Sequence, residues 1–158
     1  MSKNRWQKSS AESMPWHSLP EQRLCISPSG LPGRMNPLGD EQSCPNYWLS
    51  CMLIDEDAMC RAVRGEKEEL WIREAGKSCP GEILRALAAF HAESRPIWKP
   101  MHMQPIYRNQ DFVVAEKGRN DPDAGADIFR RGVCLPSDNK MTKEEQDVVI
   151  DIVHRCFE

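Results

Sequence analysis

The chain has 158 residues, which is enough for one domain of ordinary size and too few for two large ones. Its 21 basic and 24 acidic residues give a net charge of -3 and are spread along the sequence, which argues against a nucleic-acid partner. No apolar run approaches the ~18 residues that span a bilayer, and the polar start lacks a secretory signal, so we expect a cytoplasmic protein without a membrane partner.

Seven cysteines occur at irregular spacings, and no two of them form a CxxC pair. Their odd number and scattered positions argue against a disulfide framework. Zinc ligands usually occur as two close pairs, whereas these cysteines and the four histidines stand singly, so no metal site is expected. The cysteines fit small apolar core residues in a reducing compartment.

Residues 1–34 are expected to form an irregular or disordered leader. The first 45 residues hold six of the 12 prolines, together with several glycines and serines, and have neither a helical nor a strand period. We therefore place the start of the ordered domain between Arg34 and Asn46 and assign residues 35–158 to that domain.

The stretch NYWLSCMLID (46–55) is the best strand candidate, because aromatic and aliphatic residues lie on both of its faces. Apolar residues on both faces predict a strand that is covered on both sides. Residues 57–64 could form a short helix, and the charged run after them, RGEKEEL, is expected to be a solvated surface.

A helix is predicted from Pro80, with Pro80 at its first position and Glu82 near the positive end of its dipole. Its buried face is expected to contain Ile83, Leu84, Leu87, Ala88 and, at its edge, His91, and Pro96 should end the pattern by about Ser94. The next segment, RPIWKPMHMQPIY (95–107), has prolines that allow only short extended pieces.

Three short elements are predicted at the C-terminal end of the chain. Residues 117–126 should form a polar loop, residues 127–131 one or two helical turns, and residues 133–135 a short strand stopped by Pro136. The last helix should start at a capping box made by Thr142 and Glu145. Its apolar face comprises Val148, Val149, Ile152, Val153, Cys156 and Phe157.

The densest group of chemically interesting side chains lies in residues 95–107 and comprises Arg95, Trp98, Lys99, His102, Gln104 and Tyr107. Prolines fix this segment, so it could present a cation, an imidazole and an aromatic face to an anionic or sugar-like ligand. An irregular crossing between a helix and a strand would need the same prolines, so both interpretations stay open. No sequence pattern supports a hydrolytic triad or a phosphate-binding glycine loop.

Three stretches, residues 46–55, 95–107 and 127–157, together resemble the C-terminal small domain of the DegT/DnrJ-type sugar aminotransferases. The most specific part is FRRGVCLPSDNKMT (129–142). The resemblance covers about residues 35–158. It implies an α+β fold, in which a short, mostly antiparallel sheet is packed by helices, as in the small domain of fold-type I aminotransferases that depend on pyridoxal phosphate.

The resemblance also implies a reaction. In this family glutamate usually gives its amino group to pyridoxal phosphate, which passes it to a keto group on a sugar nucleotide used for surface polysaccharides or glycans. By the same matching, Lys99, His102 and Gln104 fall in a segment that approaches the active-site mouth, so they are candidates for substrate binding. Catalytic, cofactor-binding and metal-binding residues are not expected in this chain.

The family's Schiff-base lysine lies in a Ser- and Gly-rich segment that nothing before Asn46 resembles, and Lys99 matches a different position. We therefore expect an inactive fragment that binds no pyridoxal phosphate alone and that pairs with a large domain or with a second copy. A truncated or frame-disrupted gene copy would explain this pattern, as would an excised domain with an unrelated leader. The alternative is a non-catalytic binding or assembly module that docks on a separate large domain.

Overall fold

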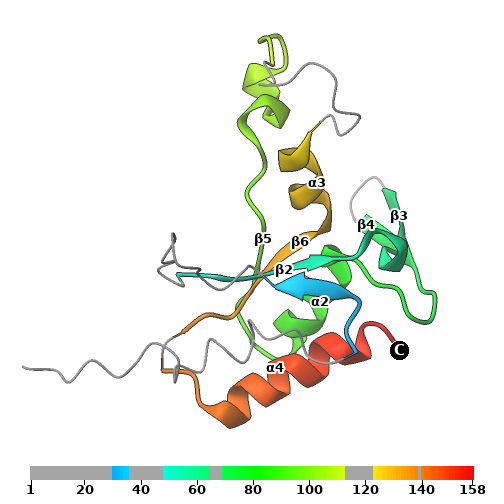
Figure 1. The fold of residues 1–158 in the computed structure, drawn as a ribbon, viewed down its shortest axis with the longest axis vertical. Helices are drawn as coiled ribbons and strands as arrows, with labels where there is room; N and C mark the ends of the chain where they lie inside the picture. The colour runs from blue at the N-terminus through cyan, green and yellow to red at the C-terminus, as the bar shows by residue number, and fades with distance from the viewer. Residues whose placement is uncertain (1–29, 36–47, 65–68, 113–122, 139) are drawn as a thin grey trace, which may run out of the picture.

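The computed structural model describes residues 30–35, 48–64, 69–112, 123–138 and 140–158 of the chain (Figure 1). Within these ranges the strands and helices follow one another as β1 (Gly33–Met35), β2 (Ser50–Ile54), β3 (Arg61–Arg64), β4 (Glu69–Ile72), α2 (Pro80–Ala89), β5 (Arg95–Pro96), α3 (Ala124–Arg131), β6 (Gly132–Leu135) and α4 (Lys143–Arg155). Short 3-10 turns occur at Glu56–Ala58, Met101–Met103 and Pro105–Tyr107.

The main sheet has four strands in the order β1-β2-β6-β5, and each neighbouring pair is antiparallel. The two central strands, β2 and β6, are far apart in sequence and pair in the register that sets Cys51 opposite Cys134. Helices α2 and α4 lie together on one side of this sheet (Figure 1). The α+β class and the antiparallel sheet predicted from the sequence are confirmed.

The hydrophobic core fills the space between the sheet and helices α2 and α4. Its members are side chains that alternate along β2 and β6 and that recur at three- and four-residue steps along the helices. They are Met52, Ile54, Ala58, Ile83, Leu87, Val133, Leu135, Val149, Ile152, Val153, Cys156 and Phe157. Removal of this apolar surface from water is the main term that stabilises the fold.

Strand β2 is shorter than the stretch 46–55 that predicts it, and its two faces differ. Ser50, Met52 and Ile54 are buried toward the helices, while Cys51 and Leu53 on the opposite face are only partly buried. The strand was predicted to be covered on both sides, and the structure buries one of its faces fully and the other partly. Residues 46 and 47 lie outside the described residues.

The helix expected over residues 57–64 is wrong. A 3-10 turn at Glu56–Ala58 is followed by strand β3, which pairs with β4 in a separate antiparallel hairpin. The backbone at Met59 is extended and forms a bridge to Ser78, so the chain leaves the helical region directly after Ala58. Pairing with β4 in the hairpin, together with the bridge from Met59 to Ser78, has overridden a weak helical preference here.

Helix α2 ends earlier than expected, and its buried face is narrower. The helix ends at Ala89 and is followed by Phe90 and His91, whose side chains are both exposed. His91 has a positive φ of 58°, which ends the helical path of the backbone. Ala88 is exposed too, so Ile83 and Leu87 carry the contact with the sheet.

Helix α4 begins at the predicted capping box of Thr142 and Glu145, which is confirmed. Val148, by contrast, is 52% exposed and does not belong to the predicted buried face.

Helix α3 begins at Ala124, three residues before the predicted start, because the Asp123 side chain accepts a hydrogen bond from the Ala126 amide and caps the first turn. The strand after α3 is confirmed and extends from Gly132 to Leu135.

Strand β1, near the N-terminal end of the described residues, contains Gly33 and Arg34, which were predicted to belong to the leader. These two residues pair with Ile54 and Leu53 of β2. Within the described residues no helix is both long and apolar enough to cross a bilayer.

Gly132 joins α3 to β6 at a point of close approach. A Cβ atom at this position would meet Ile97 Cγ1 at 2.4 Å and the Ile128 carbonyl oxygen at 2.5 Å. Gly132→Ala should therefore destabilise the protein by about 1–3 kcal/mol in urea unfolding, since a neighbouring side chain or the backbone must shift.

Gly125→Ala is the matched control for this substitution. A Cβ atom at Gly125 would meet its nearest neighbours, on Asp123 and Pro100, at 3.4 Å, and it would reduce the entropy of the unfolded chain. We expect little change, or a small gain, in the free energy of unfolding. Equal stability losses for the two variants would contradict the close approach at Gly132.

Candidate functional site

Residues 97–112, called the arm below, leave the edge strand β5 and run along α3 away from the sheet (Figure 1). The first residue of the arm, Ile97, packs its side chain against Gly132 at the end of α3. Pro100 lies near Gly125 in the first turn of α3. Prolines interrupt the arm so that it forms two short 3-10 turns instead of a helix. The segment that contains Lys99, His102 and Gln104 is therefore attached to the start and to the end of α3.

A histidine–carboxylate contact fastens the arm to the start of α3. His102 Nε2 lies 2.5 Å from Asp123 Oδ2, and the imidazole stacks on Phe112 with ring centroids 4.0 Å apart. The same Asp123 carboxylate caps α3 through the Ala126 amide, which together with His102 holds the pKa of Asp123 below its ordinary value. Asp123 therefore serves the helix and the arm at once.

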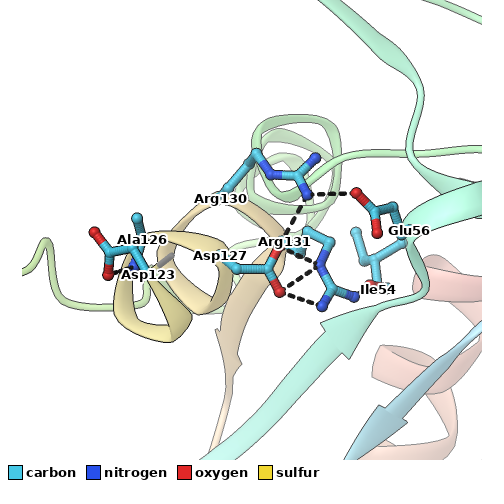
Figure 2. A network of polar contacts seen from close by, with 7 residues as sticks. All are labelled: Ile54, Glu56, Asp123, Ala126, Asp127, Arg130 and Arg131. Atoms are coloured by element: carbon cyan, nitrogen blue, oxygen red, sulfur yellow. Dashed lines mark hydrogen bonds and ion pairs between the residues drawn. The ribbon is translucent and has the colours of Figure 1, made fainter. Parts of the chain in front are cut away.

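A second polar network fastens the end of α3 to the sheet (Figure 2). Arg131 Nε donates to both oxygens of Asp127, at 2.9 and 3.1 Å, and its Nη1 donates to the Ile54 carbonyl oxygen at 2.6 Å. Arg130 donates to Asp127 Oδ1 at 2.8 Å and to Glu56 Oε1 at 3.0 Å. Hydrogen bonds from Arg131, and then from Arg130, lower the pKa of Asp127 to about 2.

An open groove of about 1320 Å³ lies between the base of the arm and the first turn of α4. Its aromatic wall is formed by Trp48 and Trp98, which are mostly exposed and stand 5.8 Å apart at their ring centroids. The charged side chains of the lining are of both signs; the cations are Arg95, Lys99 and Lys140, and the anions are Glu93, Asp138 and Glu145. Two exposed indoles with cations nearby suit a ligand that combines a flat or sugar-like face with an anionic group.

The three candidate residues from the sequence occupy different positions. Lys99 lines the groove, whereas His102 faces Asp123 at the start of α3. Gln104 donates from Nε2 to the Lys99 carbonyl oxygen at 3.2 Å and so fixes the local path of the arm. Among the described residues, Lys99 is thus the candidate that lines the groove, whereas His102 and Gln104 form hydrogen bonds within the protein.

Sequence reasoning missed Asp123, Trp48 and Arg131. Asp is a preferred helix cap, but the polar stretch 117–126 that contains Asp123 predicts a loop. Trp48 belonged to a predicted strand, although it lies just before β2 and pairs with Trp98 in the groove. Nothing in the local sequence could show that Arg131 reaches the carbonyl of Ile54, because the two residues meet only through the fold.

Comparison with known proteins assigns the chain to a family. The DegT/DnrJ/EryC1/StrS aminotransferase family matches residues 67–154, which is more than half of the chain. The chain belongs to this family. The matched region contains the arm, α3, β6 and nearly all of α4. It therefore includes His102, Asp123, Asp127, Arg130 and Arg131 and much of the groove lining, whereas Ile54 and Glu56 lie outside it. The family resemblance stated from the sequence is confirmed.

One relative is EpsN of Bacillus subtilis (strain 168), whose name assigns it provisionally to the pyridoxal phosphate-dependent aminotransferases. This aminotransferase-family chain is 40% identical to EpsN in an alignment of 81 residues, and the match covers 49% of the chain. The same match covers 19% of EpsN, so the chain spans about a fifth of the length of that relative.

The lysines of the described residues do not fit an anchor for pyridoxal phosphate, which needs a neutral amine in an enclosed polar site. Lys77 Nζ lies 2.8 Å from Glu74 Oε2, and that hydrogen bond raises the pKa of Lys77 and keeps the amine protonated. Lys99, Lys140 and Lys143 are exposed. We therefore derive no chemical step through this cofactor within the described residues.

Acid should loosen the junction of α3 with the sheet. The pKa of Asp127 is lower in the folded state, about 2, than its ordinary value of 3.8. The carboxylate therefore stabilises the fold above pH ~4, and this contribution is lost as the pH falls through about 2. Since Asp127 is 31% exposed, water screens part of the effect, and urea unfolding should show a loss of about 1–2 kcal/mol from this group.

Asp127→Asn provides the control for this pH dependence. The variant should be less stable than the parent near neutral pH and should lose less of its stability on acidification, because it lacks the titrating group. Parallel stability curves for the two proteins between about pH 5 and pH 2 would contradict the role of Asp127.

Proposed function

We propose that this chain supplies the small-domain part of a pyridoxal phosphate-dependent sugar aminotransferase. The complete enzyme would transfer an amino group, from glutamate, to a keto group of a sugar nucleotide used for surface polysaccharide or glycan synthesis. Family membership over residues 67–154 is the observation that carries this proposal. The name of EpsN, a relative at 40% identity, supports the same cofactor.

The groove supports a sugar nucleotide as the substrate class. A nucleotide-linked sugar combines a flat base, sugar rings and a diphosphate, and the groove offers two exposed indoles beside Lys99 and Lys140. Indole faces pack on bases and sugars, while lysine ammonium groups attract phosphate oxygens. In this proposal Lys99 contacts the substrate, and His102 and Gln104 hold the arm that carries it.

In the same proposal, the small domain begins with strand β1 (Gly33–Met35), which pairs with β2, and the residues before it form a leader outside the family pattern. Catalysis would require a large domain, or a second copy of a complete enzyme, to provide the aldimine lysine and the remaining walls of the groove. The chain alone would be inactive. Its scattered cysteines fit a reducing compartment, so we place it in the cytoplasm.

A second candidate function is a non-catalytic module that docks on a separate large domain. The apolar side chains exposed along the arm and α3 favour a docking role; Met101, Ile106 and Phe112 are more than half exposed, and Ile128 is 44% exposed. An experiment that mixes the chain with an independently produced large domain of a family member distinguishes the two candidate functions. Amino transfer by the mixture supports the aminotransferase, and a stable but inactive complex supports the module.

Pyridoxal phosphate should not form a Schiff base with the purified full chain. Spectra recorded after mixing, and again after borohydride treatment, should show no protein-bound chromophore above the level of a lysine-rich control protein. The physical reason is that the described lysines are either ion-paired or exposed. Stoichiometric labelling of one lysine would contradict the proposal that the anchor lies outside this chain.

Lys99→Ala should weaken binding of a sugar nucleotide, with UDP-glucose and its dTDP and GDP counterparts as probes in tryptophan-fluorescence titrations. Loss of one charge-assisted hydrogen bond should raise Kd by roughly tenfold or more. Lys143→Ala is the matched control, because Lys143 is an exposed lysine of α4 outside the groove lining. Equal affinities for the two variants would contradict substrate contact by Lys99.

A further inference from the structure

Two cysteines face each other across the central strands of the sheet. Cys51 in β2 and Cys134 in β6 are register partners, and their Sγ atoms lie 3.8 Å apart. Both project from the sheet face opposite the core, since Met52 and Val133 beside them belong to that core. Adjacent strands therefore hold the two thiols in van der Waals contact.

The backbone geometry of such a pair already suits a disulfide. Directly opposed residues in antiparallel strands have Cα atoms about 4.5–5.5 Å apart, within the range of about 4.4–6.8 Å that disulfides require. Rotation about the Cα–Cβ bonds can close the remaining distance between the sulfur atoms without moving the strands. The two strands lie side by side in the middle of the sheet (Figure 1), which keeps the pair in register.

The two thiols differ in access. Cys51 is partly exposed, whereas Cys134 is 3% exposed, and burial raises the pKa of Cys134 to about 12. A thiolate performs the attack in thiol–disulfide exchange, so the accessible Cys51 should react first. Cys134 is then positioned to displace whatever group Cys51 has acquired.

We propose that Cys51 and Cys134 form a reversible modification site, which a small disulfide such as oxidised glutathione converts to a cross-strand disulfide. Cys51 sulfur attacks the oxidant and forms a mixed disulfide, and one glutathione leaves. Cys134 sulfur then attacks Cys51 Sγ, the mixed bond breaks, and a second glutathione leaves. In total the two cysteines lose two electrons and two protons, and the two released glutathione thiols carry these electrons and protons.

The bond would act at the wall of the groove. Cys134 lines that groove, and its strand partner in β5 is Arg95. Arg95 lies three residues before Trp98 and four before Lys99. A covalent link between β2 and β6 would restrict movement of the sheet beneath the arm. This inference rests on the register of the strands and stands independently of the proposed aminotransferase function.

The test uses the reduced full chain, incubated with mixtures of reduced and oxidised glutathione, then alkylated, digested and analysed by mass spectrometry. We expect a peptide that joins Cys51 to Cys134 to exceed any other linked pair by roughly tenfold. Cys51 is accessible to the oxidant, whereas Cys60 and Cys79, which also lie next to each other, are both buried. Reduction should restore both thiols. Absence of this peptide while Cys51 carries glutathione would overturn the proposal, as would a predominant bridge between other cysteines.

Two variants sharpen the result. Cys134→Ser should stop the reaction at the mixed disulfide on Cys51, since the second attacking sulfur is missing. Cys60→Ser is the matched control, because Cys60 is a buried cysteine next to Cys79 and its loss should leave the Cys51–Cys134 bridge unchanged. A bridge yield that falls equally in both variants would contradict a specific pair. Mapping of the unmutated chain decides the question if either variant fails to fold.

Discussion

The arrangement of the whole site depends on the Arg131 side chain. This side chain is only 12% exposed, and its guanidinium donates to both carboxylate oxygens of Asp127 and to the carbonyl oxygen of Ile54 at the end of β2. Hydrogen bonds of this charged kind stabilise a structure by about 1.5–3 kcal/mol each. They fix the last turn of α3 against the central strand of the sheet (Figure 2).

The other parts of the site follow from this anchored helix. With its end fixed, α3 presents Asp123 at its start, and Asp123 holds His102 of the arm. Gly132 lets Ile97 pack closely where the arm begins, so Trp98 and Lys99 emerge beside the groove. The arm is thus held at its base and at its middle, which gives an irregular segment a defined position without a helix or strand of its own.

Much of this architecture was predictable from the sequence. The apolar period and the capping box of Thr142 located α4, and the apolar run between Gly132 and Pro136 located β6, because these signals are local. The hairpin β3–β4 and the end of α2 were mispredicted. Strand pairing within the hairpin decided the first, and the turn at His91 decided the second. The segment of the site was predicted, but the partners Asp123 and Ile54 were not, because they meet His102 and Arg131 only after folding.

The most direct test of this account is amide hydrogen exchange on Arg131→Met, which keeps an apolar stem and removes the guanidinium. Amides of α3 and of the arm should exchange roughly tenfold faster or more, because the variant loses the hydrogen bonds of Arg131 to Ile54 and Asp127. Amides of α2 and α4 should keep their protection, because the substitution leaves the core contacts of these helices in place. Unchanged protection in α3, or a uniform loss across all the helices, would contradict the central role of Arg131.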